Sequence, residues 1–311
     1  MIKQVYHQGI HVSEEGLLPP ETACVVCGFA GERRAVLLLQ QDPRVDLLEC
    51  GCGCRSASRM PKPEVLTSYY SSYYCHGNQT GFTFDDSTRF GPHLIRQFKL
   101  GPIRNPRILD YGGGIDAALS RSLATLLIAE GAESVEIALV DYNSSCKRDW
   151  GKTTVECYPS LEEAGDQFDV VIASGIIEHI PYPHDTLLRL LHSLRGAGRA
   201  YFRTPAMSPV VRLAERLRIR LDFTFPAHVH DMGQMFWENV LQSLGATREF
   251  ELIASRPSII ETTFRLHPVP TLASHVFKLP WYFLGRTYTL VGGWEATFAR
   301  KVSLASGEAT L

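Results

Sequence analysis

The N-terminal part of the chain concentrates residues that can bind a metal. Two residues separate Cys24 from Cys27, and a glycine follows Cys27. Further on, Cys50, Cys52 and Cys54 alternate with glycines. Pairs of thiolates on tight turns are typical ligands of tetrahedral zinc, and glycine lets such turns bend. We therefore expect a zinc ion held by Cys24, Cys27, Cys50 and Cys54, with Cys52 as the alternative to Cys54. Four sulfur ligands leave no open coordination position, so this zinc is structural; the competing interpretation is a set of free thiols.

A glycine-rich turn is the second segment that points to chemistry. In ILDYGGGIDAAL, Ile108 to Leu119, a hydrophobic stretch runs into three glycines and then into a helical pattern. Glycines let the backbone approach a ligand closely and expose the amides at the start of the helix. In doubly wound sheets, ligands bind at this carboxyl end of a strand. The spacing of Gly112, Gly114 and Ala117 also fits the dinucleotide-binding fingerprint, so the turn alone does not identify the ligand.

Two carboxylates narrow the choice of ligand. Asp110 precedes the glycines at the end of the expected strand, where it would repel a pyrophosphate and attract an ammonium or sulfonium group. S-adenosylmethionine carries both of these cations and no phosphate. Asp141 ends the next expected strand, where a carboxylate can accept hydrogen bonds from both ribose hydroxyls, and the neighbouring Tyr142 could cover the adenine. Because NAD-binding proteins also use an acid there, Asp141 indicates an adenosine ligand without saying which one.

The elements around this turn alternate between two periodicities. Short runs rich in Val, Ile and Ala predict strands at 107–111, 134–141, 153–158, 168–174 and 199–205. Helical patterns fall between and around them, at 87–100, 117–130, 185–194 and 231–245. Two later strands are expected at 250–254 and 294–302, and two early ones at 33–40 and 44–50. Strands alternating with helices predict a parallel sheet covered on both faces.

Residues 106–204 resemble the class I S-adenosylmethionine-dependent methyltransferases. RILDYGGGID resembles the first motif of that family, with Asp116 in place of the usual third glycine, and IALVDYN resembles the second. FDVVIASGIIEHIPYP and the residues that follow resemble the region from the fourth strand onward. CVVCG, the later cysteines and PKPEVLTSYYSSYY resemble the zinc-binding head of a subgroup that includes sugar C-methyltransferases. FPAHVHDMGQMFWENVLQSLG resembles a later motif of the same subgroup.

The resemblance implies an α/β fold: a Rossmann-like seven-stranded sheet with a small N-terminal zinc ribbon. It divides the chain into a zinc-ribbon head at 1–62, a helical connector at 63–104 and a methyltransferase domain at 105–311. An acceptor-binding extension is expected at about 205–245. The implied cofactors are S-adenosylmethionine and a structural Zn²⁺. The expected cofactor-binding residues are Asp110, Tyr111, Gly112, Gly114, Asp141, Tyr142 and Ser174.

Two histidines are candidates for the catalytic base. His179 follows the expected fourth strand, and His228 lies just before the expected helix at 231–245, which contains two methionines. A general base is useful when the methyl acceptor carries a proton, and imidazole titrates near neutral pH. Either histidine could instead only brace its loop. Some related O-methyltransferases hold a divalent metal with a Glu-x-x-Glu-His sequence, but Gly175 stands at the first of these positions, so no such metal is expected.

We expect methyl transfer to a small-molecule acceptor such as a sugar, a nucleotide-sugar or a secondary metabolite. The alternatives are an NAD-dependent oxidoreductase or epimerase, and a zinc-binding methyltransferase-like protein without activity. The formal net charge of −2 offers no basic excess for nucleic acid or an anionic membrane, so neither is an expected partner. The N-terminus lacks the apolar core of a secretion signal, and the apolar stretch at 276–291 is interrupted by Lys, Pro, Gly and Arg residues. These features predict a cytoplasmic protein without a membrane span.

Overall fold

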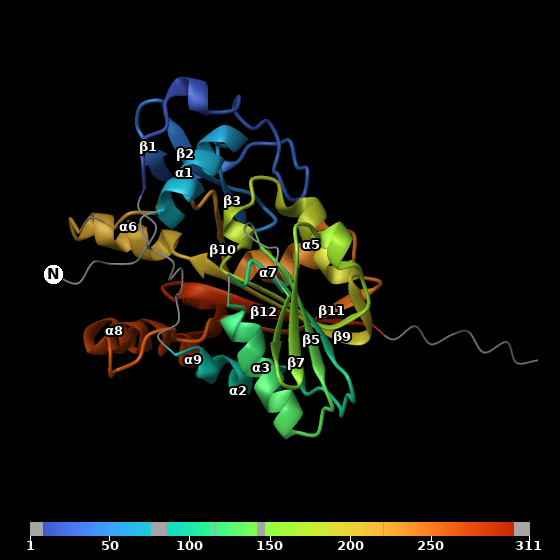
Figure 1. Cartoon of the computed structure of the whole chain (residues 1–311). Helices are drawn as coiled ribbons and strands as arrows, with labels where there is room; N and C mark the ends of the chain where they lie inside the picture. Colours follow the sequence, from blue (N-terminus) through green and yellow to red (C-terminus); the bar gives the residue numbers. More distant parts are fainter. Residues whose placement is uncertain (1–8, 76–85, 115, 142–146, 220, 302–311) are drawn as a thin grey trace, which may run out of the picture.

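The computed structural model describes residues 9–75, 86–114, 116–141, 147–219 and 221–301. These residues form two sheets, one of four strands and one of eight (Figure 1). Tyr142, one of the expected cofactor-binding residues, lies outside the described residues. None of the helices in the described ranges is long and apolar enough to cross a bilayer.

The large sheet has the strand order β11-β12-β9-β8-β4-β5-β7-β6. Its five central strands are parallel to one another, and β12 and β6 run antiparallel to their neighbours β9 and β7. The strands are β4 (Arg107–Tyr111), β5 (Val135–Val140), β6 (Lys147–Trp150), β7 (Thr153–Tyr158), β8 (Phe168–Ser174), β9 (Leu194–Ala206), β11 (Phe250–Pro257) and β12 (Gly292–Arg300).

The expected count of seven strands is wrong by one, because the structure adds β6 at the edge of the sheet. β6 pairs with β7 across a tight turn at Gly151, whose φ of +65° suits glycine. Its sequence, KRDW, carries no alternation of apolar and polar residues. Edge strands are commonly charged because an unpaired apolar edge promotes aggregation. The polar composition of β6, which gives no strand pattern in the sequence, is therefore suited to the edge of the sheet.

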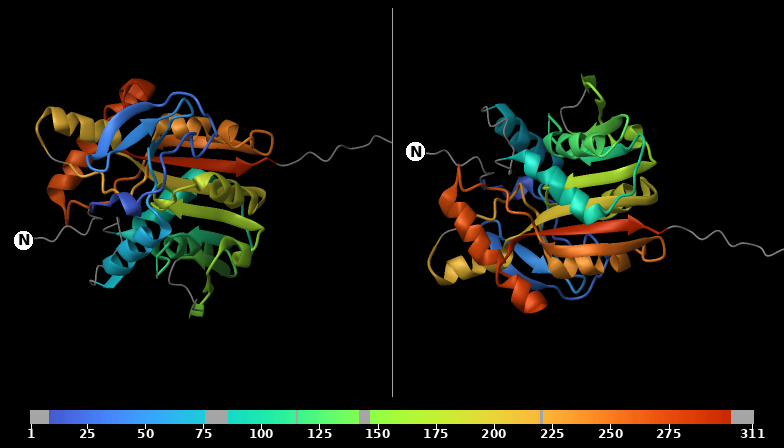
Figure 2. Two further views of the ribbon diagram at one scale, coloured as in Figure 1. Left: turned by 90° about the horizontal axis from the view of Figure 1, so that it is seen from above. Right: turned by 90° about the horizontal axis from the view of Figure 1, so that it is seen from below.

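Helices cover both faces of the large sheet (Figure 2). On one face, α2 (Phe90–Phe98) and α3 (Ala118–Ala129) pack with Ile108 and other sheet residues in one apolar cluster. On the other, α5 (Pro183–His192) and α7 (Gln234–Ser243) pack with Leu109. Successive strand residues face opposite sides, so neighbours in β4 belong to different cores. The remaining helices are α1 (Pro63–Cys75), α4 (Leu161–Ala164), α6 (Ser208–Arg216), α8 (Pro268–Lys278), α9 (Trp281–Leu284) and four short 3₁₀ turns.

The N-terminal head is not a separate unit in space. Its three strands, β1 (Arg34–Gln40), β2 (Val45–Glu49) and β3 (Cys54–Ala57), are joined by a fourth, β10 (His230–Met232), which comes from the expected acceptor-binding extension. β10 runs antiparallel to β3, with Asp231 opposite Arg55. The expected head at 1–62 and the extension at 205–245 therefore share one sheet, which Figure 1 shows above the large sheet.

Candidate functional site

The glycine turn after β4 is held at the end of the neighbouring strand. Gly112 and Gly114 have φ values of +74° and +71°, a region in which glycine is strongly favoured. The Gly112 amide donates to the carbonyl of Val140 (2.8 Å), and the Gly114 amide donates to Oδ2 of Asp141 (2.9 Å). A Cβ atom at Gly114 would meet nothing within 4 Å, so the turn is open on that side. Asp141 thus fixes the turn and stands beside the open space.

Asp110 lies beneath the turn. Its side chain is buried and accepts a hydrogen bond from Ser120 Oγ (2.6 Å). Burial raises the pKa of Asp110 to about 7, and the nearby charge of Asp141 adds to this effect. A Cβ atom at Gly113 would lie 2.3–2.5 Å from the carboxylate atoms of Asp110, so only glycine fits between the turn and this acid. The carboxylate therefore lies beneath the turn and not at an open strand tip.

Two other expected cofactor residues point elsewhere. The ring of Tyr111 packs among the apolar side chains on the α5 and α7 face of the sheet, because it follows Asp110 and faces the opposite side. Its contribution to a cofactor site would therefore come from the main chain. Ser174 ends β8, and its Oγ accepts a hydrogen bond from Nε of Arg203 (2.8 Å). This serine is a partner of a buried arginine.

The two candidate histidines lie together. The rings of His179 and His228 are 4.8 Å apart between centroids. Nδ1 of His179 is 2.8 Å from the carbonyl of Ala227 and 3.0 Å from the hydroxyl of Tyr70, and Nδ1 of His228 is 2.7 Å from Thr224 Oγ1. A carbonyl can only accept, so Nδ1 of His179 carries the proton and Nε2 presents a lone pair. This is the tautomer that a general base needs.

Glu178 completes a cluster that the sequence reasoning did not assign. Ligand atoms of Glu178, His179 and His228 all lie within 4.8 Å of one another. Oε1 of Glu178 is 4.0 Å from Nε2 of His179, while its Oε2 is buried without a hydrogen-bond partner. Burial raises the pKa of Glu178 to about 7. The sequence signal was present, since a carboxylate that directly follows an apolar strand and its glycine turn is rarely buried without a role.

The loop that carries this cluster packs against the glycine turn. A Cβ atom at Gly112 would meet the side chain of Ile176 at 2.6 Å, so the two segments are in close contact. Gly175 donates its amide to the carbonyl of Arg203 (2.8 Å), and the Arg203 guanidinium forms an ion pair with Glu261. Arg203 was missed although an arginine in an otherwise buried strand is itself a signal. The glycine turn, the loop that carries the histidine and Arg203 are therefore in contact with one another.

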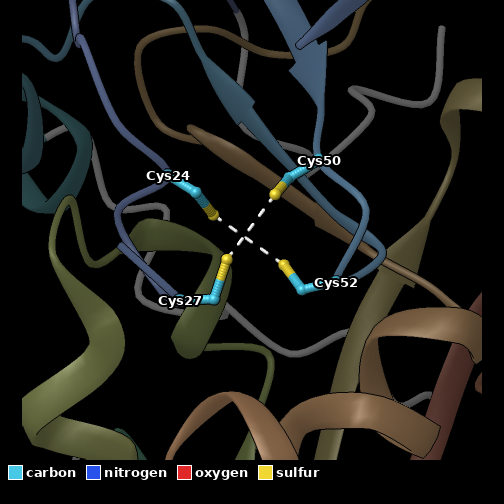
Figure 3. A group of neighbouring side chains, drawn as sticks. All are labelled: Cys24, Cys27, Cys50 and Cys52. Carbon is cyan, nitrogen blue, oxygen red and sulfur yellow. Dashed lines mark hydrogen bonds between the residues drawn. The ribbon is translucent and has the colours of Figure 1, made fainter. Parts of the chain in front are cut away.

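Four cysteines of the head form a compact cluster (Figure 3). The Sγ atoms of Cys24, Cys27, Cys50 and Cys52 lie within 4.8 Å of one another. The Sγ atoms of Cys24 and Cys52 are 3.8 Å apart, and those of Cys27 and Cys50 are 3.6 Å apart. The cluster differs from the expected set because it contains Cys52 and not Cys54. Cys54 is the first residue of β3 and is fully buried, with Sγ 3.2 Å from Ser56 Oγ, whereas Cys52 lies at the tip of the loop.

The loop from Cys50 to Cys54 packs against helix α7 of the large sheet. It closes through a hydrogen bond from the Cys50 amide to the Cys54 carbonyl (2.9 Å). At Gly53, where φ is +90°, a Cβ atom would lie 2.4 Å from the backbone nitrogen of Phe236. Phe236 belongs to the first turn of α7, so this glycine is needed for the loop to contact the helix. The cysteine cluster and the sheet-covering helix are consequently one packed unit.

The comparisons with known proteins agree with this geometry. A sequence model of the methyltransferase domain family matches residues 82–255, more than half of the chain. The chain belongs to this family. The methyltransferase is an enzyme of class I, the S-adenosylmethionine-dependent class, and the match includes the glycine turn, Asp141 and the histidine of the β8 loop. No curated protein matches it.

Solved structures with a similar fold include two methyltransferases and a cyclopropane synthase. The plantazolicin methyltransferase BpumL, in complex with SAH, shares 12% identity over 69% of this methyltransferase and 82% of BpumL, with a TM-score of 0.44. The CurJ carbon methyltransferase shares 13% identity over 73% and 58%, with a TM-score of 0.43. The cyclopropane synthase MmaA2 from Mycobacterium tuberculosis shares 14% identity over 67% and 83%, with a TM-score of 0.39.

Proposed function

We propose that the protein transfers a methyl group from S-adenosylmethionine to a small-molecule acceptor, with His179 as the base. The observation that carries the proposal is the contact between the glycine turn and the histidine loop through Ile176. It brings the groups suited to an adenosine and a cation next to the imidazole of His179, whose Nδ1 donates to the carbonyl of Ala227. When bound, S-adenosylmethionine supplies an electrophilic methyl group on a sulfonium.

The protein's own part in this reaction is alignment and proton removal. Methyl transfer is an in-line displacement, so holding the acceptor in line with the methyl group accounts for much of the rate. As the bond from acceptor to methyl forms and the sulfur–methyl bond breaks, the acceptor proton passes to Nε2 of His179. The carbonyl of Ala227 fixes the imidazole tautomer, and His228, held by Thr224, supports its ring.

The residues at the glycine turn fit this cofactor better than a dinucleotide. The buried Asp110 carboxylate beneath the turn favours a cation over a pyrophosphate. Asp141 stands at the end of β5, where a ribose would lie beside the turn. This assignment is tested by calorimetry with S-adenosylhomocysteine and with NADH. Tighter binding of NADH would overturn it.

A variant of Asp141 tests the cofactor site more directly. Asp141→Ala removes the acceptor of the Gly114 amide and the expected partner of the ribose, so we expect affinity for S-adenosylhomocysteine to fall at least about tenfold. Asp149→Ala, on the exposed edge strand β6, is the matched control and should bind as the wild type does. Unchanged affinity in Asp141→Ala would remove this residue from the site.

The base is tested by substituting the two histidines. His179→Ala should lower turnover by roughly 100- to 10,000-fold while affinity for S-adenosylhomocysteine stays nearly unchanged. His228→Ala should have the smaller effect, since it acts on the ring of His179. His192→Ala, a half-exposed histidine on α5, is the control. If His179→Ala keeps its turnover on a true acceptor, alignment alone drives transfer and the histidine is a loop brace.

We also propose that Cys24, Cys27, Cys50 and Cys52 hold a structural zinc ion. Zinc–sulfur bonds of about 2.3 Å at tetrahedral angles place sulfurs about 3.8 Å apart, and the two contacts in the cluster are 3.8 and 3.6 Å. All four donors are thiols, the ligand type typical of structural zinc. The expected result is one zinc per chain by elemental analysis, lost in Cys52→Ser and retained in Cys54→Ser. If Cys52→Ser retains the zinc and Cys54→Ser loses it, Cys54 and not Cys52 is the fourth ligand.

The finer identity of the acceptor is also a proposal. The cysteine-bearing head and the Tyr-rich helix α1, which brings Tyr70 to His179, support an acceptor of the kind used by sugar C-methyltransferases. A cytoplasmic location accords with a metal site built from reduced thiols. Methyl release measured on a panel of nucleotide-sugars and secondary metabolites tests the acceptor class, and a product methylated on carbon would support the sugar assignment.

A further inference from the structure

Helix α8 exposes its apolar side chains and buries a polar one. Its apolar side chains Val269, Leu272 and Val276, together with Leu279 just beyond the helix, are exposed, and Val269 reaches 75% exposure. Their spacing of three, four and three residues places them along one side of the helix. A helix that packs on a globular core normally turns this stripe inward. The apolar side of α8 therefore does not serve the fold of this chain.

The inward side of α8 is polar. Thr271, which is 2% exposed, donates to the carbonyl of His267 (2.6 Å) and lies 2.8 Å from Thr262 Oγ1. Lys278 Nζ donates to the carbonyl of Ser258 (2.6 Å). Hydrogen bonds thus hold the helix to the domain and fix which side faces outward. The exposure of the apolar stripe is a consequence of these specific contacts.

Two other segments at the same end of the molecule also expose apolar side chains. After α8, only Trp281 of α9 turns inward, with its ring 5.6 Å from that of Trp294. The next residues point outward, and Phe283 is 81% exposed. Past the end of α6, three more large apolar side chains are exposed. The whole surface, named here the α6–α8–α9 surface, comprises Leu217, Ile219, Leu221, Val269, Leu272, Val276, Leu279, Tyr282, Phe283 and Leu284.

The α6–α8–α9 surface lies at the edge of the sheet where the active site opens. α6 directly follows the end of β9, and the pairing of Gly292 with Ala206 brings the start of β12 to the same edge. Because α8 and α9 lie between β11 and β12, they emerge there as well. All three helices occupy one end of the molecule in Figures 1 and 2. The parallel strands β4 and β8, which carry the glycine turn and the histidine loop, also end at this edge.

The charge of this surface distinguishes between possible partners. The sequence from Thr262 to Trp294 contains no Asp or Glu; within it, Arg265 is exposed, whereas Lys278 faces inward and Arg286 pairs with Glu238. At the end of α6, the exposed Arg216 and Arg218 alternate with the exposed Leu217 and Ile219. A second copy of the chain docking through the same surface would bring these cations against each other. A surface with negative charge outside and hydrocarbon beneath complements both the arginines and the apolar side chains.

We propose that the α6–α8–α9 surface binds the interface of an anionic lipid bilayer. Exposed Val, Leu and aromatic side chains enter the headgroup and acyl boundary, and the arginines contact the lipid phosphates and carboxylates. The whole-chain charge of −2 conceals this local excess, which is why composition alone argued against a membrane partner. The inference concerns peripheral binding and does not depend on the proposed methyl transfer.

The test is flotation of the full chain with vesicles. The wild type should float with vesicles of phosphatidylcholine mixed with phosphatidylserine and much less with phosphatidylcholine alone, and added salt should weaken the binding. The double variant Val276→Asp/Phe283→Asp should bind the anionic vesicles at least about tenfold less, because it replaces inserted apolar groups with repelled charges. Ile253→Asp, at a similarly exposed apolar residue on β11, is the control and should bind as the wild type does.

Each other outcome overturns the proposal. Absence of flotation in the wild type, or equal flotation of the double variant, shows that the surface does not bind lipid. A dimer in sedimentation velocity that the double variant abolishes, with no flotation, assigns the surface to a second copy instead. Thermal unfolding of both variants shows that they are folded, and S-adenosylhomocysteine affinity, measured separately, keeps this result distinct from a failure of the proposed function.

Discussion

Replacing Gly113 with alanine tests the geometry of the cofactor turn. The added Cβ would lie 2.3 Å from the nearest atoms of the Asp110 carboxylate, whereas ordinary contacts are 3.4–4 Å. The turn or the acid must therefore move by about 1 Å. Neither is free to do so, because Ser120 holds the carboxylate and Asp141 holds the turn through Gly114.

The expected effect follows from the cost of overpacking a closely packed site. Such insertions cost about 1–3 kcal/mol, which corresponds to a loss of about 5- to 150-fold in affinity if the displaced turn must be restored on binding. Calorimetry with S-adenosylhomocysteine measures this loss. Gly101→Ala is the control, since a methyl group there meets nothing within 4 Å. It should leave the affinity unchanged.

A double variant separates this clash from a general intolerance of the turn. If the carboxylate is what obstructs the methyl group, Gly113→Ala should cost little in a background of Asp110→Ala, where the space is vacated. The two substitutions would then be clearly non-additive. Wild-type affinity in Gly113→Ala, or penalties that simply add in the double variant, would refute the reasoning.

Three further predictions concern stability. Gly53→Ala should destabilise the fold by about 2–4 kcal/mol by pushing the cysteine loop off α7, and Gly51→Ala, where a methyl group meets nothing, should not; thermal unfolding compares them. Burial raises the pKa of Glu178 from its ordinary 4.5 to about 7, so its contribution to stability is present below the ordinary value and lost as the pH rises through 7. Glu178→Gln should therefore gain stability relative to the wild type in urea unfolding at pH 8 compared with pH 5, and an equal difference at both would contradict this. Asp231→Asn should cost about 2–4 kcal/mol, because it removes the buried charge that pairs with the partly exposed Arg55; unchanged urea unfolding would show that this pair does not stabilise the head.

The central strands and the glycine turn could be predicted because their signals are local. Each of β4, β5 and β8 is rich in Ile, Leu, Val or Ala, as expected for strands covered on both faces, and β4 and β5 lead directly into Gly112 and Asp141. The histidines could also be singled out, although their proximity depends on a chain reversal that brings His228 back to His179. Their mutual contact was not visible in either local pattern.

The remaining features depend on contacts between distant segments. β10 has only three residues and is a strand solely because β3 accepts it, so no periodicity could indicate it. The choice of Cys52 over Cys54 depends on how the loop closes: Cys54 continues into β3 and is buried there, whereas Cys52 stays at the tip. Cysteine spacing alone could not separate these two arrangements.

The pairing of β3 with β10 also has a consequence for synthesis on the ribosome. β3 ends at Ala57 and its partner begins at His230, so most of the chain must emerge before the head sheet can close. The helix against which Gly53 packs is made later still. Pairings between residues so distant in sequence form slowly. The nascent cysteines thus spend much of translation without their final support, and a chain that stops before His230 should not complete its head.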